Sequence, residues 1–365
     1  MTLGVSGWRI HGMRTGVGRY LLNVVRHWTS PAPFDRITFY APGTVDRSEI
    51  PLPVGVAVER LRPHWRMLLW ENARLGPFVD DDVLFCPSHS RPLLTRSRTV
   101  VVMHDMNSVL HPEMFPRSNT LFYNRLYEWS VRHATLVITD SEAGRQDILR
   151  CWNVPAEKIR VVYLGAEECF HPVAEVPAPA QPFFLFVGKM SGRRNLPCLL
   201  EAFALLKKQT SLPHELALVG LNPHRIDLER IAGRLGIARH VRICGFISDE
   251  ELNFLYNRAE ALVMPSVYET VSLPVMEAQA AGAPVVCIDT EGMREITGGA
   301  ACLMPRLEPR ALLEGMLRVA EDRAFRDTIA ARGLEHSKQF SWRRCARETL
   351  DVLAEAARRH PRGAF

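Results

Sequence analysis

The sequence lacks any apolar run long enough to span a bilayer, because its hydrophobic stretches have the length of β-strands. No segment at its start has the composition of a signal peptide. The eight cysteines are scattered and none forms a C-x-x-C pair, which argues against a disulfide framework and against a zinc site. These absences favour a protein of the reducing cytoplasm. Any membrane association is then expected to be peripheral, at the inner face of the membrane.

The sequence also has little net charge of either sign. With 45 Lys and Arg residues against 40 Asp and Glu residues, the formal charge is +5. Such a balance suits an anionic small molecule better than a nucleic acid, which needs a concentrated basic face, so we expect no nucleic-acid partner. A G-x-G-x-x-G motif followed by a ribose-binding acid is missing after the first predicted strand, which argues against a dinucleotide-dependent dehydrogenase.

The order of the predicted elements indicates two domains. A chain of 365 residues is long enough for two domains that each bury a core. Predicted strands alternate with predicted helices on both sides of a segment at 171–182 that is rich in proline and alanine. This alternation predicts an α/β fold with two Rossmann-like domains. We place an amino-terminal domain at 1–170, a linker at 171–182 and a carboxyl-terminal domain at 183–340.

The most informative stretch is 265–278, which follows an apolar segment at 260–264 that predicts a buried strand. The stretch opens a predicted helix with Ser272 as its N-cap. A helix start just past a strand end offers unpaired N–H groups to a phosphate. The carboxylates of Glu269 and Glu277 flank this seat, and ionised carboxylates accept directional hydrogen bonds from sugar hydroxyls. The stretch therefore predicts a nucleotide-sugar site.

Three further segments place glycine or positive charge after predicted strands. Gly188, Lys189 and Arg194 lie between a strand and a helix start, where a glycine turn with cations predicts an anion site. Gly16 lies in a glycine turn between the first predicted strand and a helix. His104 follows an apolar strand, at the edge where open α/β sheets bind ligands. These residues are candidates for the same ligand site.

The pattern P-S-x-Y-E-x-x-x-L-P-x-x-E-A-x-A-x-G-x-P-V-V at 265–286 resembles the donor-site signature of family 4 of the retaining GT-B glycosyltransferases. Segments 15–20, 102–105 and 188–195 are similar to other motifs of the family, so the resemblance covers essentially the whole chain. It implies the GT-B fold, in which two Rossmann-like domains face each other across a central cleft. It also implies that a last helix, here at 341–360, packs back onto the amino-terminal domain.

The resemblance implies catalytic roles for four residues. Glu269 orients the donor hexose, and His104 reaches the same sugar. Arg194 and Lys189 neutralise the diphosphate, so that no metal ion is required and no cofactor is expected. The aspartates Asp80–Asp82 do not change this expectation, because a D-x-D metal site follows a strand and these residues precede one.

The resemblance also implies a set of donor-binding residues. Glu277 holds the ribose hydroxyls, and the backbone after the strand at 241–245 meets the nucleotide base. The implied set consists of Gly16, Gly188, Phe246, Ile247, Val271, Ser272, Leu273 and Glu277. The chain departs from the family at Val271 and Ser272, where Phe-Gly or a similar pair is usual. A serine hydroxyl at this place is able to donate to a phosphate.

The activity that the resemblance implies is transfer of a hexose from a nucleoside diphosphate sugar to a glycan or lipid-linked saccharide acceptor, with retention of anomeric configuration. GDP-mannose and UDP-sugars are the expected donors, because the motifs are most similar to those of bacterial polysaccharide and lipopolysaccharide enzymes. Two alternatives stay open at this point: a nucleotide-sugar 2-epimerase of the same fold, and a non-catalytic nucleotide-sugar-binding protein.

Two smaller features also allow two interpretations. The basic, aromatic segment at 63–71 is either a face for a membrane or lipid acceptor, or a helix that packs its apolar side chains onto the sheet. Arg294 follows the predicted strand at 284–288, and it either adds charge near the phosphates or points to solvent.

Overall fold

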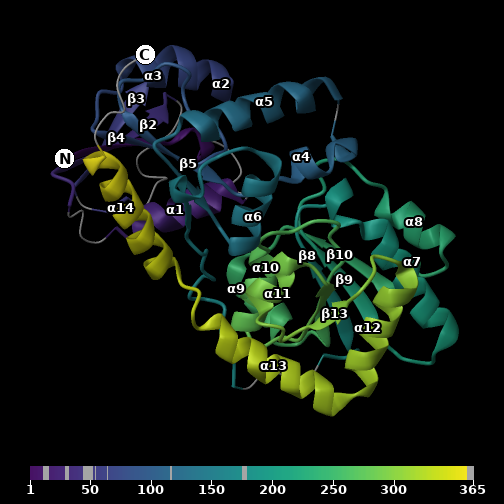
Figure 1. Cartoon of the computed structure of the whole chain (residues 1–365). Helices are drawn as coiled ribbons and strands as arrows, with labels where there is room; N and C mark the ends of the chain where they lie inside the picture. Colours follow the sequence, from purple (N-terminus) through teal and green to yellow (C-terminus); the bar gives the residue numbers. More distant parts are fainter. Residues whose placement is uncertain are drawn as a thin grey trace. The chain divides into compact units, whose positions relative to one another are not determined.

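The computed structural model describes residues 1–10, 16–28, 33–43, 52–53, 55–63, 65–115, 117–174 and 179–359. The chain forms two compact units (Figure 1). The first unit comprises Met1–Gly165 together with Trp342–Phe365, and the second comprises Ala166–Ser341. Each unit contains one parallel β-sheet, which confirms the predicted α/β fold with two Rossmann-like domains.

The first unit is built on a seven-stranded parallel sheet with the strand order β3-β2-β1-β4-β5-β6-β7. The strands are β1 (Thr2–Ser6), β2 (Arg36–Pro42), β3 (Val56–Leu61), β4 (Val83–Cys86), β5 (Arg98–Met103), β6 (Leu136–Thr139) and β7 (Ile159–Val161). Short apolar runs form β4 and most of β5, whose residues after Arg98 are all buried, because strands covered on both faces bury their side chains. Parallel pairing aligns Met103 with Thr139, so β5 and β6 end together at one edge.

The helices of the first unit connect and cover these strands. They are η1 (Trp8–Ile10), α1 (Val17–Arg26), α2 (Met67–Trp70), η3 (Glu71–Leu75), α3 (Gly76–Phe78), α4 (Asn107–Leu110), η4 (Pro112–Met114), α5 (Arg117–His133), α6 (Glu142–Cys151), η5 (Ala156–Lys158) and α14 (Trp342–Arg358). The last helix, α14, packs against α1 and strands β4 to β6. Trp28 Nε1 donates a hydrogen bond to the Ala346 carbonyl at 3.2 Å, which ties this helix to the unit.

The second unit contains a six-stranded parallel sheet with the order β10-β9-β8-β11-β12-β13. Its strands are β8 (Phe183–Val187), β9 (Glu215–Val219), β10 (Val241–Gly245), β11 (Ala261–Met264), β12 (Val285–Ile288) and β13 (Cys302–Met304). Its helices are η6 (Gly192–Arg194), α7 (Leu196–Gln209), α8 (Leu228–Arg234), η7 (Ala238–His240), α9 (Asp249–Tyr256), α10 (Leu273–Ala280), α11 (Glu291–Thr297), α12 (Pro309–Glu321) and α13 (Arg323–Ser337).

The boundary between the units lies earlier than the sequence predicted. The contacts divide the chain after Gly165, whereas we placed the linker at 171–182. The reason is that residues before the proline-rich segment already pack on the second unit. Phe170 meets the Tyr256 ring edge-on at 5.7 Å, and the His171 N–H donates to Asn253 Oδ1 at 3.2 Å. Residues 175–178 of the predicted linker, and residue 360 of the predicted last helix, lie outside the described residues.

Several apolar side chains of the first unit are exposed. Within α2 only Trp70 is buried, while Leu69 is 60% exposed, so this short helix does not pack all its apolar residues onto the sheet. Phe78 at the end of α3 is 59% exposed and Leu94 is 80% exposed. His64 of the same segment lies outside the described residues. Among the residues that the structure describes, no helix combines the length and the apolarity needed to cross a bilayer.

Close backbone packing joins the strand ends of the second unit. The Gly188 N–H donates to the Val219 carbonyl at 3.0 Å, and the Gly220 N–H donates to the Gly245 carbonyl at 2.7 Å. Gly220 has a φ of +133°, and a Cβ at this position would lie 2.1 Å from the Gly188 carbonyl oxygen. Only glycine allows this approach, because any side chain would collide with backbone atoms.

Replacing Gly220 by alanine is expected to destabilise the protein by more than about 2 kcal/mol, since the Cβ meets rigid backbone in a conformation that side chains disfavour. The matched control is Gly233→Ala in α8, where a Cβ meets nothing within 4 Å. This control is expected to be neutral or slightly stabilising. Urea unfolding followed by circular dichroism measures both, and equal midpoints for the two variants would contradict the packing argument.

Candidate functional site

The predicted donor residues of the second unit all follow the carboxyl ends of its strands. Gly188 follows β8, Phe246 follows β10, and the stretch that begins at Pro265 follows β11. Because the strands are parallel, these loops lie at one edge of the sheet. The structure thus brings together on one edge the residues that the sequence analysis selected from three separate segments.

A buried ion pair lies at the centre of this edge. The residues Arg194 and Glu269 are 8% and 4% exposed, and Arg194 Nη1 donates to Glu269 Oε1. The same nitrogen lies 3.1 Å from Ser266 Oγ, and Arg193 Nη1 approaches Glu269 Oε2 at 3.8 Å. The sequence analysis assigned Arg194 and Glu269 to different parts of a ligand. The structure shows that they are paired with each other.

The basic loop after β8 is shaped to hold Arg194 inward. Gly188 has a φ of +148°, and a Cβ there would stand 3.4 Å from Arg194 Nε. Asn195 adopts the left-handed conformation, which turns the chain from η6 into α7. The Val267 N–H donates to the Arg193 carbonyl at 2.9 Å and joins this loop to the one after β11. Lys189 is exposed, so its charge remains accessible to a ligand.

The predicted helix after β11 is α10, and Ser272 occupies its N-cap position as expected. The Ser272 side chain makes no capping hydrogen bond, although the residue is only 1% exposed. Its Oγ is a buried polar atom without a partner. Such atoms are rare in folded proteins, so this hydroxyl at a helix N-terminus is available to a ligand oxygen. Val271 and Leu273 beside it are half-buried.

Glu277 lies inside α10 and is 2% exposed. The Tyr256 hydroxyl at the end of α9 donates to Glu277 Oε2 at 3.2 Å. Sequence reasoning missed Tyr256, because nothing local distinguishes a tyrosine in the last turn of a helix. Phe246 is 70% exposed and Ile247 is half-buried, just before the capping box of Ser248. This exposed turn leaves its backbone open to a planar ligand group.

Arg294 at the same edge has a partner that the sequence did not indicate. Its guanidinium donates to both oxygens of Asp289, at 2.5 Å and 2.6 Å. The hydrogen bonds to Arg294 hold the pKa of Asp289 below its usual value. The arginine side chain is 65% exposed, which favours the solvent-facing interpretation of this residue.

In the first unit His104 follows β5, and both nitrogens of its ring are engaged. Nδ1 lies 2.7 Å from Asp140 Oδ2, and Nε2 lies 3.0 Å from the Pro87 carbonyl oxygen. A carbonyl oxygen only accepts hydrogen bonds, so Nε2 carries a proton. Burial alone lowers the pKa of His104, but the Asp140 carboxylate, with a smaller contribution from Asp105, raises it above its usual value.

Two further rings around His104 were missed by the sequence analysis. The Tyr20 ring meets it edge-on at 4.8 Å, and the His89 ring does so at 5.5 Å. Burial, followed by the charge of His104, lowers the pKa of His89 to about 3, so His89 is neutral. His89 follows the end of β4 as His104 follows β5, and the same argument from strand ends would have found it.

Gly16 occupies the N-cap position of α1 with a φ of +45°, as a glycine turn requires. The first residue of the predicted motif, Thr15, lies outside the described residues. The acidic triplet lies in the loop before β4, as predicted. Asp81 Oδ2 accepts from the Tyr40 hydroxyl at 2.8 Å, and Asp82 Oδ2 accepts from the Thr2 N–H at 2.7 Å, so this loop is joined to β2 and to β1.

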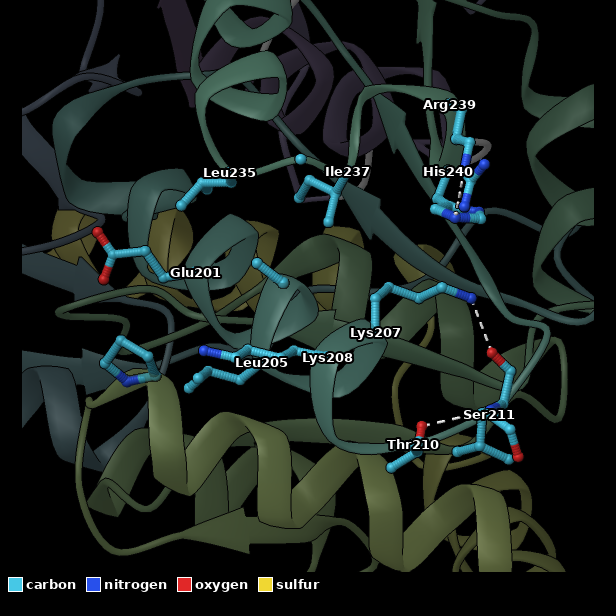
Figure 2. Close-up of a pocket in the computed structure, with 14 residues that line it drawn as sticks. Glu201, Leu205, Lys207, Lys208, Thr210, Ser211, Leu235, Ile237, Arg239 and His240 are labelled. Carbon is cyan, nitrogen blue, oxygen red and sulfur yellow. Dashed lines mark hydrogen bonds between the residues drawn. The ribbon is translucent and has the colours of Figure 1, made fainter.

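A cavity of about 760 Å³ in the second unit lies away from all these residues (Figure 2). Its lining includes Leu212 and His240, which precede β9 and β10, so it opens at the amino-terminal edge of the sheet. Lys207 in its wall donates to the Leu212 carbonyl at 2.7 Å (Figure 2). None of the predicted site residues lines this cavity. The cavity is therefore separate from the candidate residues at the carboxyl edges of the sheets.

Comparisons with known proteins match both halves of the chain. Residues 14–168 match the model of Glycosyltransferase Family 4, and residues 171–336 match that of Glycosyl transferases group 1. The chain is 27% identical over 368 residues to O-antigen chain mannosyltransferase B of Escherichia coli, covering 93% of this chain and 95% of that protein.

Two solved structures share the fold. Sucrose-phosphate synthase from Thermosynechococcus elongatus superposes with a TM-score of 0.77 at 19% identity, covering 97% of this chain and 98% of that one. Anabaena HepE in complex with UDP-glucose superposes with a TM-score of 0.75 at 19% identity, covering 97% and 100%. Both are GT-B structures, so the expected fold family is confirmed.

Replacing Glu269 by alanine is expected to destabilise the protein by about 3 kcal/mol, because it leaves the buried Arg194 charge without its carboxylate. Adding Arg194→Met to this variant is expected to restore part of the loss, since no buried charge then remains. The control is Glu314→Ala, which removes an exposed ion pair to Arg310 in α12. Urea unfolding of the three variants tests the assignment, and an unchanged midpoint for Glu269→Ala would show that the pair contributes nothing.

Proposed function

The chain belongs to the glycosyltransferases, with a family 4 domain followed by a group 1 domain, and on this premise we propose a specific reaction. In the proposed reaction a hexose moves from a nucleoside diphosphate sugar to a glycan or lipid-linked saccharide, with retention of configuration and without a metal ion. The observation that carries the proposal is the seat at the start of α10, where Arg194, Ser272 and two buried carboxylates gather at one sheet edge.

The cations at this edge support stabilisation of a departing diphosphate. Negative charge grows on the diphosphate as the sugar–oxygen bond breaks, so groups that bind it more tightly in the transition state accelerate the reaction. Arg194 and Lys189, the N-terminus of α10 and the free Ser272 hydroxyl are suited to this task. In a metal-free enzyme these groups take over the charge neutralisation that a divalent ion supplies elsewhere.

The ion pair between Arg194 and Glu269 implies that the donor binds in two stages. An incoming diphosphate competes with Glu269 for the Arg194 guanidinium, because both are anions that accept from the same N–H groups. As Arg194 turns to the diphosphate, the Glu269 carboxylate becomes available to the hexose hydroxyls. Glu277, which Tyr256 holds in place, binds the ribose hydroxyls in the same way.

The proposed chemical step needs no protein base. The acceptor hydroxyl attacks the anomeric carbon on the face from which the diphosphate leaves. The carbon–oxygen bond to the diphosphate breaks, its electron pair stays on the phosphate oxygen, and that oxygen takes the acceptor proton. Retention of configuration follows. A mannose donor is favoured because the relative that spans 93% of the chain is named a mannosyltransferase, while HepE binds UDP-glucose, so UDP-sugars are tested beside GDP-mannose.

The central test is a nucleotide titration followed by thermal unfolding. UDP or GDP is expected to raise the unfolding temperature in the presence of EDTA, because ligand binding to the native state stabilises it. The matching sugar donor is then expected to give a product with the donor's anomeric configuration, read by NMR. Loss of transfer in EDTA, with recovery on adding manganese, would contradict the metal-free proposal. Conversion of the donor without an acceptor would indicate an epimerase.

The same titration on two variants tests the ion-pair exchange. Glu269→Gln is expected to bind free nucleoside diphosphate about 3- to 10-fold more tightly, because Arg194 no longer has a competing carboxylate, while transfer falls. Arg194→Ala is expected to weaken binding of the same nucleotide. Weaker nucleotide binding by Glu269→Gln would mean that the pair does not exchange.

The exposed apolar face of the first unit supports a lipid-linked acceptor. Leu69, Phe78 and Leu94 are all exposed, and the backbone at Leu94 lies against α3 at Gly76. Arg66 is exposed beside Leu69. Apolar side chains with basic neighbours bind anionic membrane surfaces. We assign this face to contact with a membrane that carries the acceptor.

Co-sedimentation with vesicles tests this contact. The parent protein is expected to bind vesicles that contain anionic lipid, whereas the double variant Leu69→Ser/Phe78→Ser is expected to bind at least about 5-fold less, because it loses buried apolar area. Val173→Ser, which removes an exposed apolar side chain from the second unit, is the control. Equal binding by parent and double variant would rule out this face.

A further inference from the structure

The structure assigns to Asp140 a positioning role that goes beyond the donor contacts described above: it holds His104 doubly protonated, with Nε2–H as a charge-assisted donor for the reacting ligand. This inference rests on the proposed function for the ligand, but its structural part does not depend on turnover. It follows from the hydrogen bonds and from the burial of the pair.

The first step is the burial of Asp140. The residue follows β6 and is 2% exposed, and its Oδ2 lies 2.7 Å from His104 Nδ1. Its Oδ1 is buried without a partner. The N-cap of α6 is Ser141, whose Oγ accepts from the Gly144 N–H at 3.0 Å, so Asp140 does not cap this helix. A buried carboxylate with one partner is costly unless that partner is a cation.

The hydrogen-bond partners of the His104 ring indicate how many protons the ring carries. The Pro87 carbonyl at 3.0 Å requires a proton on Nε2, and the Asp140 carboxylate at 2.7 Å favours a proton on Nδ1. With both nitrogens protonated, the ring has no lone pair and does not act as a general base. The positive charge makes Nε2–H a stronger hydrogen-bond donor. This N–H is able to exchange the Pro87 carbonyl oxygen for a ligand oxygen as its acceptor. The side chain is 12% exposed, so its edge reaches the surface.

Further titratable groups surround the pair of Asp140 and His104. The titratable groups that face His104 are Asp105 next in the chain, His89 after β4 and Tyr20 on α1, with Cys345 of α14 near Tyr20 and Asp140. His89 is neutral because burial and the neighbouring His104 charge both lower its pKa. Asp105 adds negative charge and so supports the protonated ring. A cation also lies nearby, because the charge of Arg9 helps to lower the pKa of His89.

These groups determine how the protonation of His104 changes with pH. Burial lowers the pKa of His104, but Asp140 raises it above its usual value, so the doubly protonated ring persists to a higher pH than in a free imidazole and is lost as the pH rises through the raised pKa. Removing the Asp140 charge leaves burial as the largest influence, and burial lowers the pKa of an imidazole. The ring of such a variant becomes neutral at a lower pH than the parent ring.

The experiment compares the parent with Asp140→Asn and Asp140→Glu, and Glu142→Gln in the first turn of α6 is the control. In Asp140→Asn the alkaline fall of kcat is expected to move to lower pH by at least about one unit, with kcat recovering toward the parent value near about pH 5.5. The KM for the sugar donor is expected to change much less than kcat. Asp140→Glu, which keeps the charge, is expected to retain the parent profile in large part, and Glu142→Gln is expected to retain it fully.

Nitrogen-15 NMR of the histidine rings provides the reading that does not depend on turnover. At about pH 7 the parent is expected to show both His104 nitrogens protonated, whereas Asp140→Asn is expected to show a neutral ring. A neutral His104 in the parent would overturn the inference even if glycosyl transfer proceeds. Failure of transfer with a doubly protonated ring would instead count against the proposed function and leave the role of Asp140 in place. A pH profile of Asp140→Asn that matches the parent would also overturn it.

Discussion

Parallel strand pairing is the constraint on which both units depend. Strands that all run in one direction need covered faces and long crossovers, so each unit alternates short apolar strands with helices. The same constraint sends every loop that follows a strand to one edge of the sheet. Polar residues from distant parts of the chain, such as Arg194 and Glu269, therefore meet without any contact between them being encoded locally.

At both sheet edges a buried carboxylate is paired with a side chain that carries or accepts positive charge. In the second unit the buried Glu269 carboxylate is balanced by the Arg194 guanidinium, and in the first unit the buried Asp140 carboxylate is balanced by the His104 ring. Neither charge would be stable alone in an interior of low polarity. Pairing each carboxylate with a cation or an ionisable ring lowers the cost of burying it at the sheet edge. Arginine keeps its charge at all relevant pH values, whereas histidine adds a dependence on its carboxylate.

Local sequence patterns predicted the helices, strands and loops on which the candidate residues lie. The helix start at Ser272, the loop before β4 and the strand before His104 all appear where periodicity and capping residues placed them. The missed features involve contacts across the fold. Tyr256 reaches Glu277 from the preceding helix, and residues 166–173 join the second unit because Phe170 packs on Tyr256. Proline content identifies a segment without regular structure, but it does not determine the unit against which the flanking residues pack.

The sequence by itself determined the fold class, the two-unit organisation and the family, because hydrophobic periodicity, turn residues and a long motif are all local along the chain. Only the tertiary structure decided the electrical state of the site. Whether Arg194 is free or paired, and whether His104 carries one proton or two, depends on which atoms lie within hydrogen-bonding distance in an environment from which water is excluded. Such distances arise between residues that are far apart in sequence, and no local pattern contains them.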